Sequence, residues 1–331
     1  MKLAVNLVTW NGENFLKSCL DSLESQTFKD FSLLIIDNGS TDNTVSFLKE
    51  NYPQIRVVRH ENNVGFAKAH NQAIHWTKSE YVLCLNQDIV LEPNCIERLI
   101  QFMDKHSEAG AATAKVLRLQ NGEKTNYIDS VGLQIFKNYK VVDIAQGEID
   151  DGKYGMDEEV FGFSGACSIL RREALEDVQY EKEFFDEDFF SYQEDIDLSL
   201  RMRMRGWQIW RVGQAIAHHA RTARNNAVRG EKKTGAWLEI LKHRRSKSNL
   251  VNFYSYRNHL YLLNKNFVQW RFFFNVLWYE KLKFFYVLIF ETKNLRAIKD
   301  LIKNFSKLMK KRHRIVRGRC AQMEDLLKWF V

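Results

Sequence analysis

The segment YVLCLNQDIVL, residues 81–91, combines an apolar run with polar residues near its end. Residues 82–85 suit a buried β-strand, whereas Asp88 adds a carboxylate just beyond it. Such a charge must be solvated, paired or bound to a cation, because burying it alone is very unfavourable. Asn86 and Asp88 could together offer oxygen ligands to Mg²⁺ or Mn²⁺. Asp88 could instead cap the helix that follows.

Strand and helix patterns alternate on both sides of this segment, over residues 1–115. Apolar runs that suit strands occur at residues 3–9, 31–37, 55–60 and 81–86, and amphipathic helical patterns occur at residues 15–25, 41–51, 66–77 and 93–106. Ser40 or Thr41 could cap the second helix, and Pro93 suits the first turn of the fourth. This alternation predicts an α/β fold with a mostly parallel sheet. Ligands are then expected at the carboxyl ends of the strands.

The later sequence is less regular and changes character towards its end. Residues 120–160 are polar and suit loops with a short hairpin. Residues 161–175 suggest a small-residue turn, a strand and a helix, and residues 186–212 suggest an acidic loop, a helix that stops at Gly206, and a strand. Beyond about residue 225 the pattern is helical and basic.

Composition and charge indicate a large globular chain with two unlike regions. The 331 residues are 45% hydrophobic and 27% charged, which allows one large domain and an extension. Residues 232–331 hold 23 Lys+Arg and 6 Asp+Glu, a net charge of +17, whereas the preceding residues sum to −9. We therefore predict an acidic body over residues 1–230 and a basic, aromatic-rich helical extension over residues 231–331, which would face nucleic acid or anionic lipid.

The cysteines and the first residues of the chain indicate the cellular compartment in which it is expected to work. The five cysteines form no C-x-x-C pair, which predicts a reduced, cytosolic chain without structural zinc. Residues 1–12 lack the long apolar region of a signal peptide and are interpreted as a first strand.

Carboxylates that could bind a ligand or take part in a reaction occur at two further places. Asp37 ends the second strand and could bind a base or ribose, although turn residues are common there. Glu194, Asp195 and Asp197 lie in the first turn of a predicted helix. One or two of them suit a helix N-terminus, but three repel one another and raise a pKa. Arg201 could pair with Asp197 one turn later.

Histidines and absent motifs narrow the possibilities. His218 and His219 follow a predicted strand, and one could be a third metal ligand, assigned here to His218, or a phosphate contact. G-x-G-x-x-G after the first strand, G-x-x-x-x-G-K-[ST] and G-x-S-x-G are all absent. An ordinary NAD enzyme and a P-loop NTPase are thereby excluded.

Six motifs occur together in one order. They are LVTWNGENFLKSCLDSLESQT, LIIDNGSTDNT, NNVGFAKAHNQAI, LNQDIVLEP, FGFSGAC and FFSYQEDIDLSLRMRMRGW. Over residues 1–220 the chain resembles the inverting family 2 glycosyltransferases of the GT-A fold, and among them the rhamnosyltransferase-like members. The ordered set is highly specific, although each motif alone is weak.

The resemblance implies roles for the matching residues on the donor side. Thr9 and Asp37 would contact the donor nucleoside, and Gly65, Phe66 and Asn71 would line the donor pocket.

It implies roles at the metal and the acceptor as well. Asp88 would bind the divalent metal (Mg²⁺ or Mn²⁺) that holds the sugar-nucleotide diphosphate. Asn86 replaces the first Asp of the D-x-D-type motif, so the metal would have fewer charged ligands. The remaining roles are Asp195 as general base, Glu194 as a residue orienting the base or acceptor, and Gly165 and Ala166 beneath the acceptor sugar.

The extension contains an aromatic stretch followed by a polybasic run. Residues 267–290 hold eleven aromatic side chains, interrupted by charges such as Arg271 and Glu280. A spanning helix needs about twenty mostly apolar residues, so interfacial amphipathic helices are predicted instead. The polybasic run at residues 301–319 suits anionic headgroups. The alternatives are helices that pack on the catalytic domain, or a tail that binds nucleic acid.

The resemblance implies a GT-A catalytic domain over residues 1–230 that transfers a sugar. Resemblance to the rhamnosyltransferase-like members makes rhamnose from dTDP-rhamnose the leading choice, with UDP- or GDP-linked donors as alternatives. The acceptor would be a lipid-linked polysaccharide precursor at the cytoplasmic face of a bacterial membrane, and no nucleic acid partner is expected. Two other classes stay open at this point: a glycoside hydrolase that uses paired carboxylates, and a non-catalytic saccharide- or nucleic-acid-binding protein.

Overall fold

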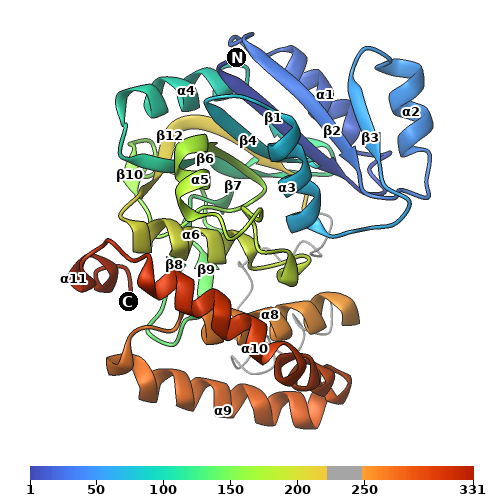
Figure 1. Cartoon of the computed structure of the whole chain (residues 1–331). Helices are drawn as coiled ribbons and strands as arrows, with labels where there is room; N and C mark the ends of the chain where they lie inside the picture. Colours follow the sequence, from blue (N-terminus) through green and yellow to red (C-terminus); the bar gives the residue numbers. More distant parts are fainter. Residues whose placement is uncertain (222–247) are drawn as a thin grey trace.

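A mixed β-sheet forms the centre of the molecule in the computed structural model, which describes residues 1–221 and 248–331 (Figure 1). The predicted boundary at residue 230 lies outside these residues. The strands are β1 (Leu3–Thr9), β2 (Phe31–Asp37), β3 (Arg56–Arg59), β4 (Tyr81–Asn86), β5 (Ile89–Leu91), β6 (Ala109–Gln120), β7 (Glu123–Ser130), β8 (Leu133–Ile135), β9 (Val141–Asp143), β10 (Glu158–Glu159), β11 (Cys167–Arg171) and β12 (Gln208–His219).

The strand order of the main sheet is β10-β12-β6-β11-β4-β1-β2-β3. Strands β1 to β4 are parallel, as the alternating pattern predicted, and β11 runs antiparallel between β4 and β6. Two further strands extend the sheet, since β5 pairs with β12 and β7 pairs with β6. A separate small sheet, β8–β9, forms the hairpin predicted within residues 120–160.

The described residues form ten α-helices. They are α1 (Leu16–Glu24), α2 (Thr44–Asn51), α3 (Phe66–Trp76), α4 (Cys95–Lys105), α5 (Arg172–Val178), α6 (Glu194–Arg205), α8 (Asn249–Asn266), α9 (Phe273–Phe290), α10 (Arg296–Arg317) and α11 (Met323–Leu327).

Two helix starts differ from the sequence-based expectation. Helix α2 begins three residues after Thr41, because the Asp42 carboxylate accepts the Thr44 N–H at 3.1 Å and so caps the first turn. Helix α4 begins at Cys95, so Pro93 precedes it rather than lying in its first turn.

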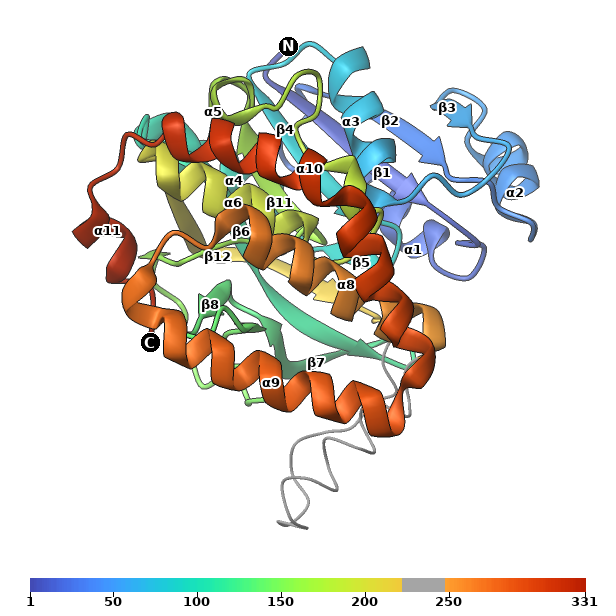
Figure 2. The same cartoon turned by 60° about the horizontal axis from the view of Figure 1, so that its bottom comes forward.

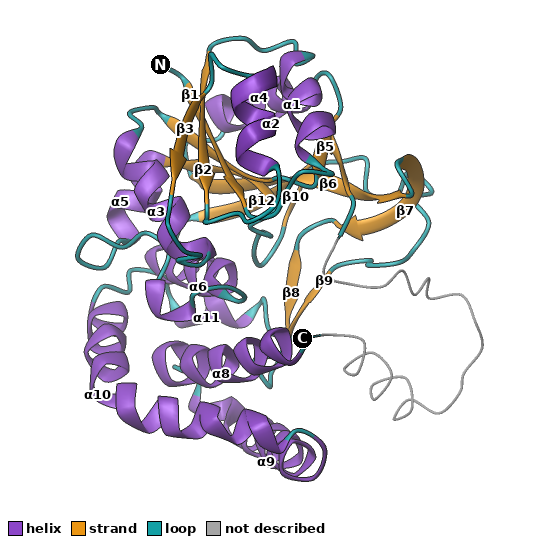
Figure 3. Cartoon of the chain, turned by 90° about the vertical axis from the view of Figure 1, so that its right-hand side faces the viewer, coloured by secondary structure: helices purple, strands orange, loops and turns teal. Residues whose placement is uncertain are grey.

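Both faces of the sheet are buried, which explains the uninterrupted apolar run of β4. Residues at positions 81, 83 and 85 pack with α1 and α4, and those at 82 and 84 pack with α3, α5 and α6. Figure 3 shows these helices on opposite sides of the strands. Alternation of side chains across a strand requires apolar residues at every position when both faces are covered.

The C-terminal helices form a further layer against the catalytic domain. Helix α8 packs on α6, α10 crosses α8, and α9 lies outermost (Figures 1 and 3). One hydrophobic cluster joins Phe189 and Leu200 of the catalytic domain to Tyr261 and Leu262 of α8 and to Leu308 of α10. The extension therefore shares a core with the catalytic domain. None of the described helices is both long and apolar enough to cross a bilayer.

Candidate active site

The polar residues that follow the parallel strands lie at one edge of the sheet. Strand register places Thr9 beside Asp37, and Val8 beside Asn86. The Asn86 N–H donates to the Ala166 carbonyl at 2.9 Å. The residues predicted on the donor side and one predicted on the acceptor side therefore adjoin.

Asp37 and Thr9 are both buried at this edge. The Asp37 carboxylate accepts the Ser40 N–H at 3.3 Å, and its second oxygen lies 3.4 Å from Arg59 Nε. The Thr9 hydroxyl donates to Gln87 Oε1. Asp37 thus holds the turn after β2, while Thr9 joins the end of β1 to the turn after β4.

Two glycines allow residues 65–66 to lie close to Phe190 and to the turn at Gly165. Gly65 has φ +89°, and a Cβ there would lie 2.4 Å from the Phe190 carbonyl oxygen. A Cβ on Gly165 would lie 2.9 Å from the ring of Phe66. Side chains at these positions would push the two segments apart.

Asp195, the predicted base, lies half-buried in the first turn of α6. Its carboxylate accepts the Gly165 N–H at 3.0 Å and the Ile196 N–H at 2.8 Å. Burial raises the pKa of Asp195 to about 6, although these two N–H groups oppose the shift. A carboxylate with that pKa is ionised at neutral pH yet basic enough to take a proton.

The two neighbouring acids behave differently from Asp195. Glu194 is buried and its Oε2 has no hydrogen-bond partner among the described residues. Burial, and then the charge of Asp195, raises the pKa of Glu194 well above its usual range. Asp197 pairs with Arg201 Nε at 2.9 Å, as predicted, and also with Lys265.

The histidine that lies beside Asp88 is His219, whereas the sequence-based assignment of a metal ligand took His218. His219 Nε2 lies 3.3 Å from Asp88 Oδ2, whereas His218 Nε2 lies 2.9 Å from Glu92 Oε1. Consecutive residues of a strand point to opposite faces. Pairing of β12 with β5 sets His219 opposite Ile89, the residue after Asp88.

His219 lies between two carboxylates, those of Asp88 and Asp129. The other ring nitrogen of His219, Nδ1, lies 2.8 Å from Asp129 Oδ2, and such a carboxylate commonly orients a metal-binding histidine. Burial alone lowers the pKa of His219, but the charges of Asp88 and Asp129 outweigh it and raise the pKa to about 9. Over residues 1–221 and 248–331, no group of three or more His, Cys, Asp or Glu is placed to hold a metal. Asp88 offers the carboxylate oxygens that Mg²⁺ prefers, and Mg²⁺ usually takes its remaining ligands from water and substrate phosphates.

Comparison with known proteins gives the family. The model described as "Glycosyl transferase family 2" matches residues 5–179, more than half of the chain. This chain belongs to glycosyltransferase family 2. It is a transferase with the GT-A fold and a C-terminal helical region.

Individual relatives of this glycosyltransferase are distant. It is 26% identical to the N-acetylglucosaminyl-diphospho-decaprenol L-rhamnosyltransferase of Mycobacterium tuberculosis, over 66% of this chain and 76% of that one. It is 33% identical to the chondroitin synthase of Pasteurella multocida, over 29% of this chain and 10% of that one. A structure of GalNAc-T7 with UDP, GalNAc and Mn²⁺ matches with a TM-score of 0.59 and 12% identity, over 80% of this chain and 48% of that one. The last match supports the fold alone.

Asn71 of the glycosyltransferase has its amide fully engaged within the protein. Its Oδ1 accepts the Phe185 N–H at 2.8 Å, and its Nδ2 donates to the Phe185 carbonyl at 2.8 Å and to Glu187 Oε1 at 3.1 Å. These bonds anchor α3 to residues 184–187, so the structure gives Asn71 a supporting role behind the predicted donor pocket.

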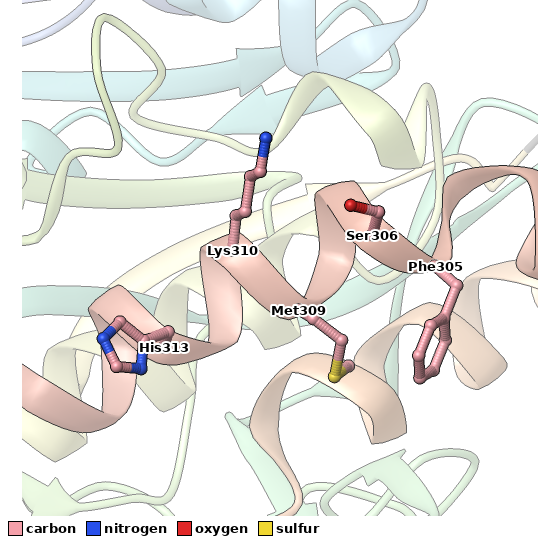
Figure 4. Close-up of a pocket in the computed structure, with 5 residues that line it drawn as sticks. All are labelled: Phe305, Ser306, Met309, Lys310 and His313. Atoms are coloured by element: carbon pink, nitrogen blue, oxygen red, sulfur yellow. The ribbon is translucent and has the colours of Figure 1, made fainter.

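Sequence reasoning missed several residues that organise this site. Gln87 Oε1 receives both the Thr9 hydroxyl and the Trp10 N–H, and its place between Asn86 and Asp88 was the only available signal. Asn38 bonds to the turn at residues 62–65. A hollow lined by Phe305, Ser306, Met309, Lys310 and His313 lies on α10 and includes none of the predicted site residues (Figure 4).

Proposed function

We propose that this glycosyltransferase moves a sugar, rhamnose as the leading choice, from a nucleoside diphosphate donor to a saccharide hydroxyl with inversion at the anomeric carbon. The observation that carries the proposal is the placement of the Asp195 carboxylate, which accepts the N–H of Gly165 beside the ring of Phe66. The pKa of this carboxylate is about 6. The choice of rhamnose is supported by the activity named for the mycobacterial relative.

In the proposed reaction Asp195 removes the proton from the acceptor hydroxyl. The acceptor oxygen then bonds to the anomeric carbon while the bond from that carbon to the diphosphate oxygen breaks on the opposite side. The proton ends on Asp195, and the electron pair of the broken bond leaves with the nucleoside diphosphate. The raised pKa of Glu194 favours its neutral form, which can donate a hydrogen bond without adding a second charge beside the base.

The donor side would be formed by the strand ends. Thr9, Asp37 and Asn86 lie at one sheet edge, the ring of Phe66 lies against Gly165, and the Asn86 N–H bonds to the Ala166 carbonyl. Asp88, together with His219 once its ring has lost a proton, would hold Mg²⁺ or Mn²⁺, which would neutralise charge on the departing diphosphate.

A lipid-linked acceptor and a position on the inner face of a bacterial membrane are part of the proposal. The relative's name specifies an acceptor on decaprenyl diphosphate. The outward side of α9 exposes Phe274, Leu277, Trp278, Phe285 and Ile289, each at least 47% accessible. The same extension holds the polybasic run at residues 301–319. Exposed apolar side chains together with such positive charge suit an anionic bilayer, which we propose as the partner of this face.

The test is a donor panel of dTDP-rhamnose, UDP-N-acetylglucosamine and GDP-mannose, each with lipid-diphosphate-linked N-acetylglucosamine as acceptor. We expect acceptor-dependent release of one nucleoside diphosphate, and a loss of about 10³-fold or more in Asp195→Asn. Asp30→Asn, an exposed aspartate outside the site, is the control. Equal release without acceptor and in Asp195→Asn would contradict transfer by this base. The rival hydrolase would release sugar from saccharides without any nucleotide.

A further inference from the structure

The loop before α6, residues 186–193, has a backbone that ordinary side chains rarely adopt. Phe190 has φ 64° and ψ −68°, and the Ser191 N–H donates to the Phe189 carbonyl at 2.7 Å, which closes a γ-turn of the rare kind. Tyr192 and Gln193 have φ values of 74° and 71°. Three non-glycine residues with positive φ in four positions are unfavourable, so the surroundings must hold them.

Helix α8 of the C-terminal extension holds this loop through Asn258. Asn258 is fully buried, and its Nδ2 donates to the carbonyls of Phe189 at 2.8 Å, Ser191 at 2.8 Å and Tyr192 at 2.7 Å. The neighbouring Arg257 donates to the Asp188 carbonyl at 2.7 Å. One asparagine thus supplies the donor for three loop carbonyls.

Lys265, two turns further along α8, contacts one residue at the start of this loop and one beyond its end. Lys265 is 1% exposed, and its Nζ contacts Asp186 at the start of the loop and Asp197 in α6, the latter at 2.8 Å. Lys311 of α10, also buried, lies 2.6 Å from the other oxygen of Asp186. Buried charges are tolerated only when they are paired, so these contacts favour one position of the loop.

The loop is continuous with the proposed base and touches the donor side. Asp195 follows Gln193 by two residues, and Asp197 follows Asp195 by two. The Phe190 carbonyl accepts the Ala67 N–H at 3.2 Å and lies against Gly65. A shift of the loop would therefore move Asp195 relative to the donor segment.

We propose that Asn258 and Lys265 are positioning residues for sugar transfer, which hold loop 186–193 in its strained form and thereby set the place of Asp195. The C-terminal extension is then a working part of the active site, in addition to any role at a membrane. This inference rests on the proposed role of Asp195 as base.

The test compares Asn258→Ala with Asn264→Ala in the full chain. Asn264 is the matched control because it lies on the same helix and its Nδ2 donates to the Leu260 carbonyl of α8 itself. Three quantities are measured: kcat and KM for dTDP-rhamnose, the thermal shift given by dTDP with Mn²⁺, and amide hydrogen exchange over residues 186–197.

We expect Asn258→Ala to lower kcat by about tenfold to a hundredfold, because a displacement on the order of 1 Å is enough for such a loss. The donor KM and the dTDP shift should change by less than about threefold on the same reasoning, and exchange should rise in residues 186–197 only. Asn258→Ser, whose hydroxyl can still donate to one carbonyl, should recover part of kcat. Asn264→Ala should match the wild type.

An unchanged kcat in Asn258→Ala, or an equal fall in Asn264→Ala, would overturn the inference while leaving the proposed function standing. If Asn258→Ala does not fold, Asn258→Ser decides in the same way. If the wild-type chain turns over none of the three sugar nucleotides, the proposed function fails and this inference fails with it.

Discussion

At the scale of single residues, the acids at the start of α6 divide the chemistry between them. Asp195 has a pKa of about 6, raised by burial, whereas burial and the charge of Asp195 raise the pKa of Glu194 well above its usual range. Two coupled carboxyls in unlike environments are a common way to obtain one base and one hydrogen-bond donor. The two carboxyl groups then titrate together, so a measured pKa describes the pair and not either residue alone.

The pH dependence of the rate follows from Asp195. Because the base acts when ionised, kcat/KM should rise with pH through about 6 and level off above it. The measurement is initial rate against pH at limiting donor, in one buffer system of constant ionic strength. A profile that falls between pH 5 and 7 would contradict the assignment.

Stability should depend on pH through Glu194 in the direction opposite to a salt-bridged acid. Its folded-state pKa is raised above 4.5, so above that pH the unfolded chain has released a proton that the folded chain retains. Stability therefore falls as pH rises. Glu194→Gln cannot ionise, so its melting temperature should exceed that of the wild type by a margin that widens as the pH rises above about 4.5. Glu97→Gln, in the first turn of α4, is the control.

Adjacent histidines allow a direct test of the metal proposal. His219 contacts Asp88, and His218 contacts Glu92 on the opposite face. We expect His219→Gln to abolish the Mn²⁺-dependent part of the dTDP thermal shift, and His218→Gln to retain it. If only His218→Gln lost the Mn²⁺-dependent shift, the metal-binding role would belong to His218.

At the scale of elements, the sequence predicted the strands and helices of the first half because their apolar patterns are regular. It also predicted that Thr9, Asp37 and Asn86 would meet, since parallel strands carry their carboxyl ends to one edge. It could not choose between His218 and His219, because that choice depends on how β12 pairs with β5. Nor could it find Asn258 or Lys265, because their contacts reach 66 to 79 residues back along the chain to a loop without a periodic pattern.

Asn71 gives a prediction at this scale, since it joins α3 to residues 184–187. Asn71→Ala should lower the free energy of unfolding by about 1–3 kcal/mol, because buried backbone groups lose their partners. The dissociation constant for dTDP should change little. Asn51→Ala is the control, as that side chain is exposed and bonds within α2. Denaturant unfolding and nucleotide titration would together separate this supporting role from direct donor contact.

At the scale of the whole molecule, the catalytic domain and the extension form one folded unit with a common core. The extension presents α9 on the side away from the sheet. Figure 2 shows this helix with the bottom of the molecule, as drawn in Figure 1, turned forward. Of its described residues, α9 fully buries Val287, so its apolar side chains contribute little to the core. We infer that binding to a surface, rather than packing, accounts for their number.

That inference predicts how the protein partitions between water and bilayer. Trp278 and Phe285 are 62% and 47% exposed on α9, and transfer of such side chains into an apolar phase is worth about 1.5–3 kcal/mol each. Trp278→Glu with Phe285→Glu should therefore reduce co-sedimentation with phosphatidylglycerol vesicles by more than about tenfold, while the melting temperature stays close to that of the wild type. Trp76→Glu changes an exposed aromatic on α3 and should leave sedimentation unchanged. Equal vesicle binding by the double variant and the wild type would exclude α9 as the contact, and loss of binding in Trp76→Glu would move the contact to the catalytic domain.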